Sequence, residues 1–172
     1  MIEQLTLPVS EADIHDLALL LLDAIDSGAS IGFMDDTTLA MAEAWWRDRI
    51  ANAGDRAVFL VARDDDGITG TVQFLPASMP NQRHRGDIAK LVIHRRARRQ
   101  GLGTALMTEI ERRALAVGVT LLVLDTKRGD AAESLYRNAD WTEVGVIPGY
   151  ALNPDGSVCD TVVFYKQLPV ER

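Results

Sequence analysis

The chain has 172 residues, of which 47% are hydrophobic and 25% are charged, and its formal net charge is −7 at pH 7. This length suits one compact domain, and the composition excludes a largely disordered chain. The apolar run at 17–22 is too short to cross a bilayer, so we expect a cytoplasmic protein without a membrane segment.

Two helices are expected in the first third of the chain. Ser10 followed by Asp13 resembles a helix N-cap, and an amphipathic pattern then runs to Gly28. A second helix is expected from about Thr38 to Ala53. Its neighbours Trp45 and Trp46 cannot face the same way, so one could pack inward while the other borders a cleft or interface. We favour the alternative, in which both are packing residues.

Strands dominate from residue 57. "AVFLVAR" and "ITGTVQFLP" flank "DDDG", which predicts a hairpin with the three aspartates at its tip rather than a calcium loop. "GDIAKLVIH" is a third expected strand. Apolar residues recur at helical spacing from Leu102 to Val117, and Gly118 is expected to end that helix.

The remaining elements alternate in type. "TLLVLDT" is expected to be a buried strand, "AAESLYRNA" a short helix, "WTEVGVI" a strand, "NPDG" a turn and "CDTVVFYKQL" a last strand. Hairpins alternate with helical crossovers, so the order predicts an α/β fold with a mixed sheet. Cys159 is the only cysteine, which excludes an internal disulfide, and we expect a structural thiol there. No Cys/His spacing suggests a metal site.

The charge is unevenly distributed along the chain. Residues 83–99 contain seven basic residues and only one acidic residue, Asp87, for a local charge of +6, so the remainder carries −13. A protein that binds a long nucleic acid usually spreads its basic residues over a broad face. One short basic segment on an acidic body instead favours a socket for a small polyanion.

The basic segment continues into a helix start in "LVIHRRARRQGLGTALMTEIERRALAVG", residues 91–118. The first turn of a helix has free backbone N–H groups and an electropositive dipole. Glycines at 101 and 103 let an anion approach those donors, and arginines add forked hydrogen bonds suited to phosphate. The arrangement predicts a pyrophosphate cradle. A solvated loop with two helix-start glycines is the structural alternative.

The run Arg98-Arg99-Gln100-Gly101-Leu102-Gly103 resembles the R/Q-x-x-G-x-G/A acyl-coenzyme A signature of the GNAT acetyltransferase superfamily. The downstream "AAESLYRNADW" resembles that family's helix ending in a tyrosine, and the order of elements agrees over essentially the whole chain. The resemblance implies a mostly antiparallel mixed central sheet with splayed strands, flanked by helices. It also implies one acetyltransferase domain over 1–172, with a helical acceptor-side region at 1–55, an acetyl-CoA-binding core at 56–128 and a C-terminal part at 129–172.

Acetyl-CoA is the co-substrate that the resemblance implies, with no metal. Its pyrophosphate would lie on the backbone of residues 98–104, and its pantetheine arm would run beside the strand that contains residues 91–93, in the opening before "TLLVLDT". The implied binding residues are Leu91, Val92, Ile93, Arg98, Arg99, Gln100, Gly101, Leu102, Gly103 and Thr104. Arg95 and Arg96 either reach the coenzyme's phosphates or stay solvated, and His94 is expected at the strand end.

Two positions depart from the family pattern. Gly129 stands where members often have an asparagine that contacts the cofactor, which removes one expected pantetheine contact. Asp140 stands where the family usually has glycine, four residues after the tyrosine, and suggests a differently shaped turn.

Direct acetyl transfer needs a neutral amine, a donor to the developing oxyanion and a proton for the leaving thiolate. By the resemblance, Tyr136 is the general acid, and the backbone N–H of Ile93 is the natural oxyanion donor. Asp125, at the end of an apolar strand, is the first candidate to bind or deprotonate the substrate ammonium, with capping as its alternative. Asp87 is a second candidate, because strand alternation predicts that it shares a face with Ala89, Leu91 and Ile93. Ordered water can replace a single base.

The acceptor is expected to be the primary amine of a small molecule, because the stretch 144–168 and "GASIGFMDD" resemble GNAT members of the tabtoxin-resistance type. The two N-terminal helices and the loop "PGYALNPDG" would border its site, with Trp45, Trp46 and Tyr150 as aromatic walls. Asp35 and Asp36 could attract a cationic amine, with a helix-cap role as the alternative for Asp36. An antibiotic-like amine, a polyamine, an amino acid and a protein N-terminus all stay open.

Other functions predict different behaviour. A non-catalytic acyl-CoA sensor would bind without turnover, and a protein N-terminal or lysine acetyltransferase would accept a polypeptide. A nucleic-acid patch at 83–99 would bind with a steep salt dependence, which the acidic remainder and the lack of interleaved aromatics argue against. A homodimer is an analogy from the superfamily.

Overall fold

The computed structural model describes residues 1–169, and residues 170–172 of the predicted domain lie outside the described residues. One seven-stranded sheet has the order β1-β2-β3-β4-β5-β7-β6. Its strands are β1 (Ile2–Gln4), β2 (Val58–Asp64), β3 (Gly67–Pro76), β4 (Arg85–Ile93), β5 (Leu121–Lys127), β6 (Thr142–Leu152) and β7 (Val158–Gln167). Only β4 and β5 pair in parallel. The predicted α/β fold with a mixed, mostly antiparallel sheet is confirmed.

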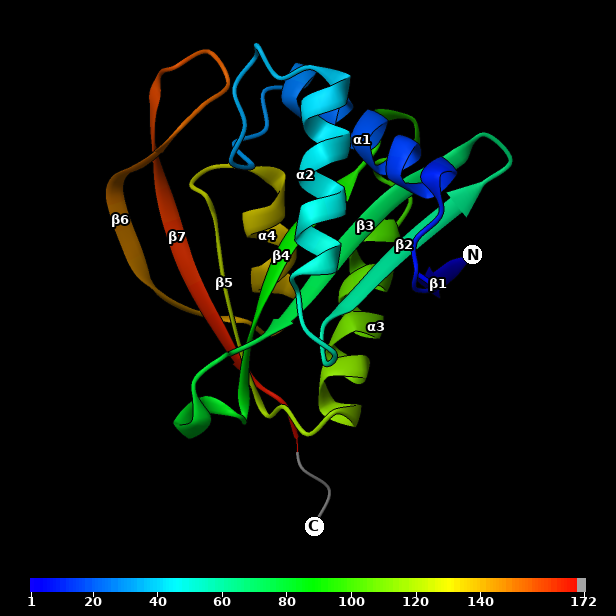
Figure 1. Ribbon diagram of the computed structural model, residues 1–172. Coiled ribbons are helices and arrows are strands. Elements are labelled where there is room, and N and C mark those ends of the chain that lie inside the picture. The colour runs from blue at the N-terminus through cyan, green and yellow to red at the C-terminus, as the bar shows by residue number, and fades with distance from the viewer. Residues whose placement is uncertain (170–172) are drawn as a thin grey trace.

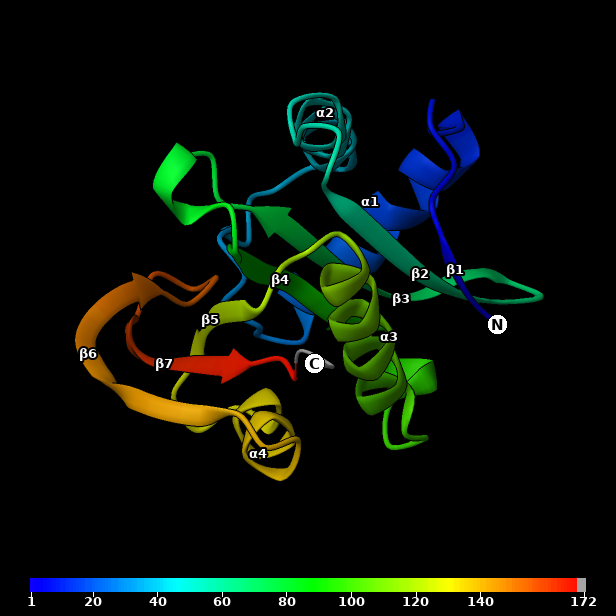
Figure 2. The same cartoon turned by 90° about the horizontal axis from the view of Figure 1, so that it is seen from below.

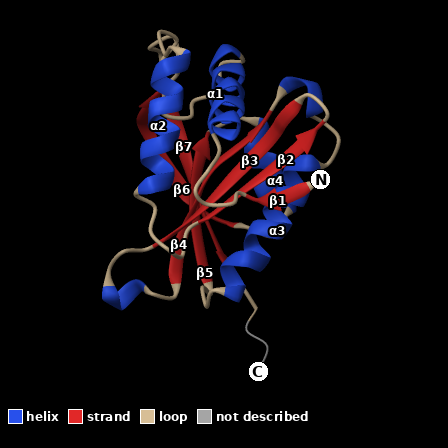
Figure 3. Ribbon diagram, turned by 45° about the vertical axis from the view of Figure 1, so that its right-hand side comes forward, coloured by secondary structure: helices blue, strands red, loops and turns tan. Residues whose placement is uncertain are grey.

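Helices cover both faces of this sheet. Helices α1 (Glu11–Asp26) and α2 (Leu39–Ala51) lie on one face, and α3 (Leu102–Ala116) and α4 (Ala131–Asn138) lie on the other (Figures 2 and 3). Each face has its own apolar core. Val72 and Phe74 of β3 pack with α3, whereas Phe59 and Val61 of β2 pack with α1 and α2. No helix within residues 1–169 is both long enough and apolar enough to cross a lipid bilayer.

The helix termini follow mostly from local sequence. Ser10 caps α1 by accepting a hydrogen bond from the Asp13 N–H at 3.1 Å, as the sequence predicts. Thr38 caps α2 and accepts from the Met41 N–H, so the helix-cap role considered for Asp36 is wrong. Gly118 ends α3 with φ +82°, and the following Val119 N–H returns to the Ala114 carbonyl.

Two strands differ from the prediction. The short β1 pairs with β2 at the sheet edge and carries too few residues for a strand pattern to be recognised. Strand β6 extends through Leu152, so most of the predicted loop "PGYALNPDG" is strand, and the turn is confined to the residues around Gly156. Pro148 is tolerated because β6 is an edge strand and the register shifts between Ile147 and Ala151.

The central feature of the sheet is a splay between β4 and β5. These strands pair only through Arg85↔Leu121, Gly86↔Leu122 and Asp87↔Val123. Figure 1 shows them adjacent at one end and diverging toward the other. Strand β5 instead stays paired with β7 along its whole length. The carboxyl halves of β4 and β5 therefore leave an opening in the middle of the sheet.

The adjacent tryptophans of α2 face different ways, and both are packing residues, as favoured. Trp46 is 1% exposed, and its indole N–H donates to the Leu17 carbonyl of α1 at 3.1 Å. Trp45 is half-buried and makes edge contacts with Phe33 and with Trp46 itself. Trp46 thus joins α2 to α1, while Trp45 lies nearer the surface.

Replacement of Trp46 with alanine is expected to lower the free energy of unfolding by about 3–5 kcal/mol, because it removes a fully buried aromatic side chain. Trp45→Ala is the matched control and is expected to cost less than half as much. Urea unfolding followed by circular dichroism measures both. Equal losses in the two variants would contradict this division of roles.

Candidate active site

A cleft of about 890 Å³ occupies the opening between β4 and β5. Its walls come from β4, the start of α3, the end of β5, α4, the loop after α1 and the facing part of β6 and β7. Almost all of the predicted site residues line it: Leu91, Val92, Ile93, Arg98, Arg99, Gly101, Leu102, Gly103, Thr104, Asp125 and Tyr136. Gln100 is the exception, because it is exposed and its amide donates to the Arg96 carbonyl at 3.2 Å.

Strand β4 carries a β-bulge in the wall of the cleft. Thr71 of β3 pairs with Val92, but Gln73 pairs with Ala89, so Lys90 and Leu91 together oppose a single residue of β3. Lys90 has φ +52°, which is uncommon for a residue other than glycine. The extra residue reverses the faces of the strand beyond it. The prediction that Asp87 and Ala89 share a face with Leu91 and Ile93 is therefore wrong.

The bulge determines which face of the sheet each side chain of residues 91–93 lies on. Leu91 and Ile93 pack against the core on the α3 side, and Val92 packs against the core under α1. The His94 N–H donates to the Thr69 carbonyl of β3 at 2.8 Å. Because successive N–H groups of a strand point to opposite edges, the Ile93 N–H faces away from β3 and toward the splay.

The helix start in the cleft offers backbone donors without a competing side chain. Gly101 is the N-cap of α3, with φ +78°, and no side chain of the described residues caps this terminus. Arg99 also has a positive φ, +61°. Gly103 has a different requirement, since a Cβ there would lie 2.8 Å from Leu135 Cδ1 of α4. One glycine thus permits the turn at the helix start, and the other lets α4 approach α3.

The four arginines between residues 95 and 99 have different partners. Arg95 forms ion pairs with Asp23 and Asp26 of α1, and Arg96 pairs with Asp64 at 3.0 Å. These two residues hold the loop against α1 and the β2–β3 hairpin, so neither is simply solvated.

Arg98 and Arg99 line the cleft instead. The Arg98 Nε donates to the Ile93 carbonyl at 3.0 Å. His94 serves the loop itself, because its Nδ1 accepts from the Arg96 N–H at 3.1 Å. Residues 95–99 therefore contain two structural arginines and two that face the cleft.

Tyr136 of α4 lies in the wall of the cleft between two aromatic rings. It is 5% exposed, and its ring centroid is 5.9 Å from those of Trp141 and Phe164. Burial raises the pKa of its hydroxyl, and the carboxylates of Asp130 and Asp125 raise it further. The hydroxyl makes no hydrogen bond to another residue in the range 1–169. Tyr136 therefore keeps its proton at any ordinary pH.

The two carboxylates predicted as bases are placed differently. Asp125 lines the cleft beyond the last β4–β5 pair, and its Oδ2 accepts from the Thr161 hydroxyl at 2.9 Å. Asp87 lies within the paired part of β4, forms an ion pair with Arg85 at 2.9 Å, and is not among the residues that line the cleft. The geometry favours Asp125.

The two positions that depart from the motif, Gly129 and Asp140, both have a positive φ. Asp140 has φ +60°, which lies in the left-handed region that a glycine would favour. Aspartate tolerates this region better than most residues, so the backbone needs no different turn. Gly129 has φ +81°, and its N–H donates to Glu133 at 2.7 Å.

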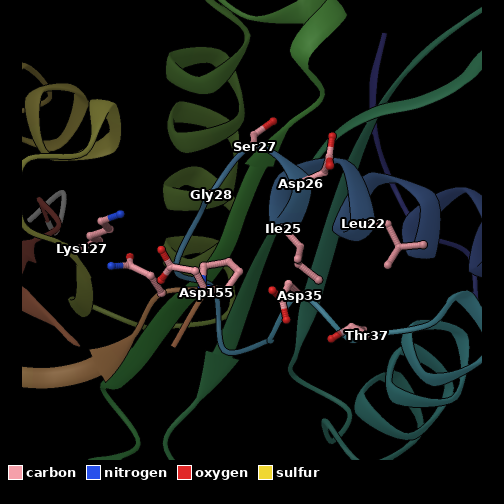
Figure 4. Close-up of a pocket in the computed structure, with 11 residues that line it drawn as sticks. Leu22, Ile25, Asp26, Ser27, Gly28, Asp35, Thr37, Lys127 and Asp155 are labelled. Atoms are coloured by element: carbon pink, nitrogen blue, oxygen red, sulfur yellow. The ribbon is translucent and has the colours of Figure 1, made fainter. Parts of the chain in front are cut away.

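A second pocket of about 740 Å³ adjoins the cleft at Ser27, Gly28 and Lys127, which line both. Figure 4 shows it between the end of α1, the following loop and the turn that carries Asp155. Asp35 lies here rather than in the main cleft. Asp36 lines neither cavity.

The aromatic walls that we expected are only partly present. Tyr150 of β6 lines the cleft, but neither tryptophan does. Cys159 lies in the wall with its thiol 3.4 Å from the Ser30 hydroxyl. Sequence reasoning missed Lys90 and Thr161, because a basic residue inside "GDIAKLVIH" and a threonine inside an apolar strand give no signal of a site.

Comparison with known proteins identifies the family to which the chain belongs. The model of the acetyltransferase (GNAT) family matches residues 22–141. An uncharacterized N-acetyltransferase from the hisH–hisA intergenic region of Azospirillum brasilense is 28% identical over 117 residues, which are 67% of this chain and 68% of that protein.

Solved structures share the fold. The yncA protein of Salmonella typhimurium, solved with its cofactor acetyl-CoA, is 20% identical, with a TM-score of 0.78 over 100% of this chain and 95% of that one. The ribosomal-protein-alanine N-acetyltransferase of Brucella melitensis is 23% identical, with a TM-score of 0.77 over 98% and 99% of the two chains. At these identities the likeness concerns the fold alone.

Asp23→Asn is expected to speed hydrogen–deuterium exchange in residues 94–101 by about tenfold or more, because hydrogen bonds to a charged acceptor contribute about 1.5–3 kcal/mol each. Asp23 is 9% exposed in its side chain and accepts from both the Arg95 N–H and the Arg95 side chain. Asp26→Asn is the control, since that carboxylate is 72% exposed and should matter little. Equal exchange rates in the two variants would contradict the anchoring role of Asp23.

Proposed function

Since this chain belongs to the acetyltransferase (GNAT) family and is an acetyl-CoA-dependent N-acetyltransferase, we propose that it acetylates the primary amine of a small molecule by direct attack, with Tyr136 as general acid. The proposal rests on one observation. The start of α3, the splayed strand β4, Tyr136 and Asp125 all line the same cleft. Donor and acceptor can meet there without a covalent enzyme intermediate.

The coenzyme end of the cleft would be the N-terminus of α3. The backbone N–H groups of Leu102, Gly103 and Thr104 are the donors that a helix leaves free in its first turn, and they suit a pyrophosphate. Arg98 and Arg99 add positive charge beside them. Strand β4 beyond Asp87 is unpaired on the β5 side, so its backbone is available to an extended amide-bearing arm.

The reaction would take place where β4 and β5 have separated. The acceptor nitrogen bonds to the acetyl carbon, and the carbon–sulfur bond of the thioester breaks. The Ile93 N–H faces this gap and can donate to the oxyanion that develops. The Tyr136 hydroxyl, which stays protonated, can give its proton to the departing thiolate. Asp125 can receive the proton of the substrate ammonium directly or through water.

Contacts across the acceptor side support a small acceptor. The Ser30 hydroxyl of the α1–α2 loop donates to the Leu152 carbonyl at 2.9 Å, and the Asp35 N–H donates to the Pro154 carbonyl at 3.1 Å. These bonds connect the loop to the β6–β7 hairpin beside the cleft. Such a connection leaves less room for an extended polypeptide than for a compact amine.

The cradle is tested by calorimetric titration of the protein with acetyl-CoA. Wild type is expected to bind with micromolar affinity, and the Arg98→Glu, Gly101→Val double variant is expected to lose this binding. Glutamate opposes the phosphate charge, and valine is strained at φ +78° and crowds the helix start. Unfolding curves of both proteins control for stability. Equal affinity in the two proteins would remove the cradle from the proposal.

Tyr136→Phe is expected to lower kcat by about 10²–10⁴-fold, the range for loss of a general acid, with little change in the KM for acetyl-CoA. The ring keeps its contacts with Trp141 and Phe164, so the fold should be unaffected. Tyr165→Phe is the matched control on β7, since Tyr165 does not line the cleft. Steady-state thiol release measures both. An unchanged kcat in Tyr136→Phe would exclude this tyrosine as the acid.

A further inference from the structure

Lys90 is a cation in the wall of the cleft, on the side that faces α1 and α2. The bulge in β4 projects it there, with the backbone in a left-handed conformation. Its Nζ donates to the Ile31 carbonyl at 2.5 Å and lies 5.6 Å and 5.3 Å from the ring centroids of Phe33 and Trp45. These partners are all neutral.

A second cation lies close to the same tryptophan. The Arg49 guanidinium of α2 is 6.0 Å from the Trp45 ring centroid, and its Nε donates to the Gln73 side-chain carbonyl at 3.1 Å. Gln73 is fully buried on β3, and its amide nitrogen has no acceptor among residues 1–169. In that same range no carboxylate lies within 4.0 Å of Lys90 or Arg49. Hydrogen-bond donors therefore exceed acceptors at this point.

This excess of positive charge is unusual in a chain with a net charge of −7. The pKa of Lys90 is lowered to about 8, chiefly by burial and also by the nearby Arg49, while Asp125 across the cleft opposes the shift. A buried ammonium without an anionic partner destabilises a fold, and a methionine of similar length would avoid that cost. Perturbed groups of this kind in a cleft are candidates for a functional role.

We propose that Lys90 binds an anionic group of the acceptor, a carboxylate, so that the acceptor is an amino acid whose amine lies toward Asp125. This inference rests on the proposed function and narrows its substrate class. Lys90 and Asp125 lie on β4 and β5, the two strands that separate to form the cleft. A zwitterion can therefore satisfy both charges at once, and its amine is brought to the strand gap.

Other acceptors fit this wall less well. A polyamine would bring further positive charge beside Lys90 and Arg49, which repel it. A protein N-terminus has an amide where an amino acid has its carboxylate, so the two cations would stay uncompensated. The acidic composition of the chain favours a cationic acceptor, but Lys90 and Arg49 are local, partly buried charges, which act more strongly than the surface average.

The test compares amino acids with their own carboxamides as acceptors. The twenty common L-amino acids, their carboxamides and spermidine are offered to wild type and to Lys90→Met with acetyl-CoA, and thiol release is followed. Wild type is expected to prefer at least one amino acid to its carboxamide. Lys90→Met should lower kcat/KM for that amino acid by about 30-fold or more, as expected for loss of a buried charged contact, and change the carboxamide by less than about threefold.

The pH dependence of kcat/KM distinguishes an effect of the Lys90 charge from an effect of the side-chain shape. Below the pKa of about 8 the Lys90 ammonium is present, and above it the charge is lost from the free enzyme. The ratio of wild-type to Lys90→Met kcat/KM for one amino acid should therefore fall as pH rises from 7 to 9.5. Titration of the substrate amine is common to both proteins. The charges that act on Lys90 are Arg49 from α2 and Asp125 from β5, and Tyr150, Cys159 and Asp160 line the same cleft from β6 and β7.

Arg112→Met is the charge control, because Arg112 is 61% exposed in its side chain on α3 and pairs only with Glu109 among the described residues. It should leave the preference unchanged. Three results would each overturn the assignment of Lys90. Wild type could prefer spermidine or the carboxamides, or Lys90→Met could lower kcat/KM equally for an amino acid and its carboxamide. The third is a ratio of wild-type to Lys90→Met kcat/KM that does not vary with pH. Such results would leave the proposed function intact if acetyl-CoA is still bound and an amine is still acetylated. Acetyl-CoA binding without acetylation of any of these amines would overturn the assignment of Lys90, because no amino acid would then be an acceptor, and the proposed function would have to be judged with other small amines.

Discussion

The geometry of this protein depends on a parallel strand pair that is made for only three residue pairs. Strands β4 and β5 separate after Asp87↔Val123, and β5 follows β7 instead. Sheet hydrogen bonds are obligatory for buried backbone, so an incomplete pair leaves donors and acceptors available in the middle of the fold. The cleft, the free edge at Ile93 and the position of Asp125 all follow from this one separation.

The charges around the splay are divided between holding the loop and binding a ligand. Asp23 and Asp64 neutralise Arg95 and Arg96, which fixes the chain between β4 and α3. A loop held in this way keeps the α3 terminus and Arg98 in place before any anion arrives, so less ordering is needed on binding. The run of arginines is therefore not one uniform basic patch, and the number of arginines overstates how many can meet a phosphate.

Much of this fold could be predicted from the sequence, because local signals were strong. Ser10, Gly118 and the "DDDG" hairpin mark their elements through capping and turn chemistry that act over a few residues. The bulge at Lys90 has no such signal, since it depends on how β4 pairs with β3, and it reverses the faces of the residues beyond it. Most of the predicted site residues lie together because the motif fixes the strand, loop and helix that carry them. The surroundings of Lys90 were missed because they are assembled from α2, β3 and the bulge, which are far apart in the sequence.

The separation of β4 from β5 and the bulge in β4 have complementary consequences. The separation opens the backbone of the strand toward β5, and the bulge turns one lysine toward α1 and α2. In a regular strand residue 90 would share the face of Ile88, which packs on the α3 side, and the bulge turns it toward α1 and α2 instead. The positive φ of Lys90 accompanies the bulge and is a local cost of that backbone conformation. Backbone strain, a partly buried cation and the opening between β4 and β5 coincide at Lys90, so this position bears more directly on the choice of acceptor than the charge of the whole chain does.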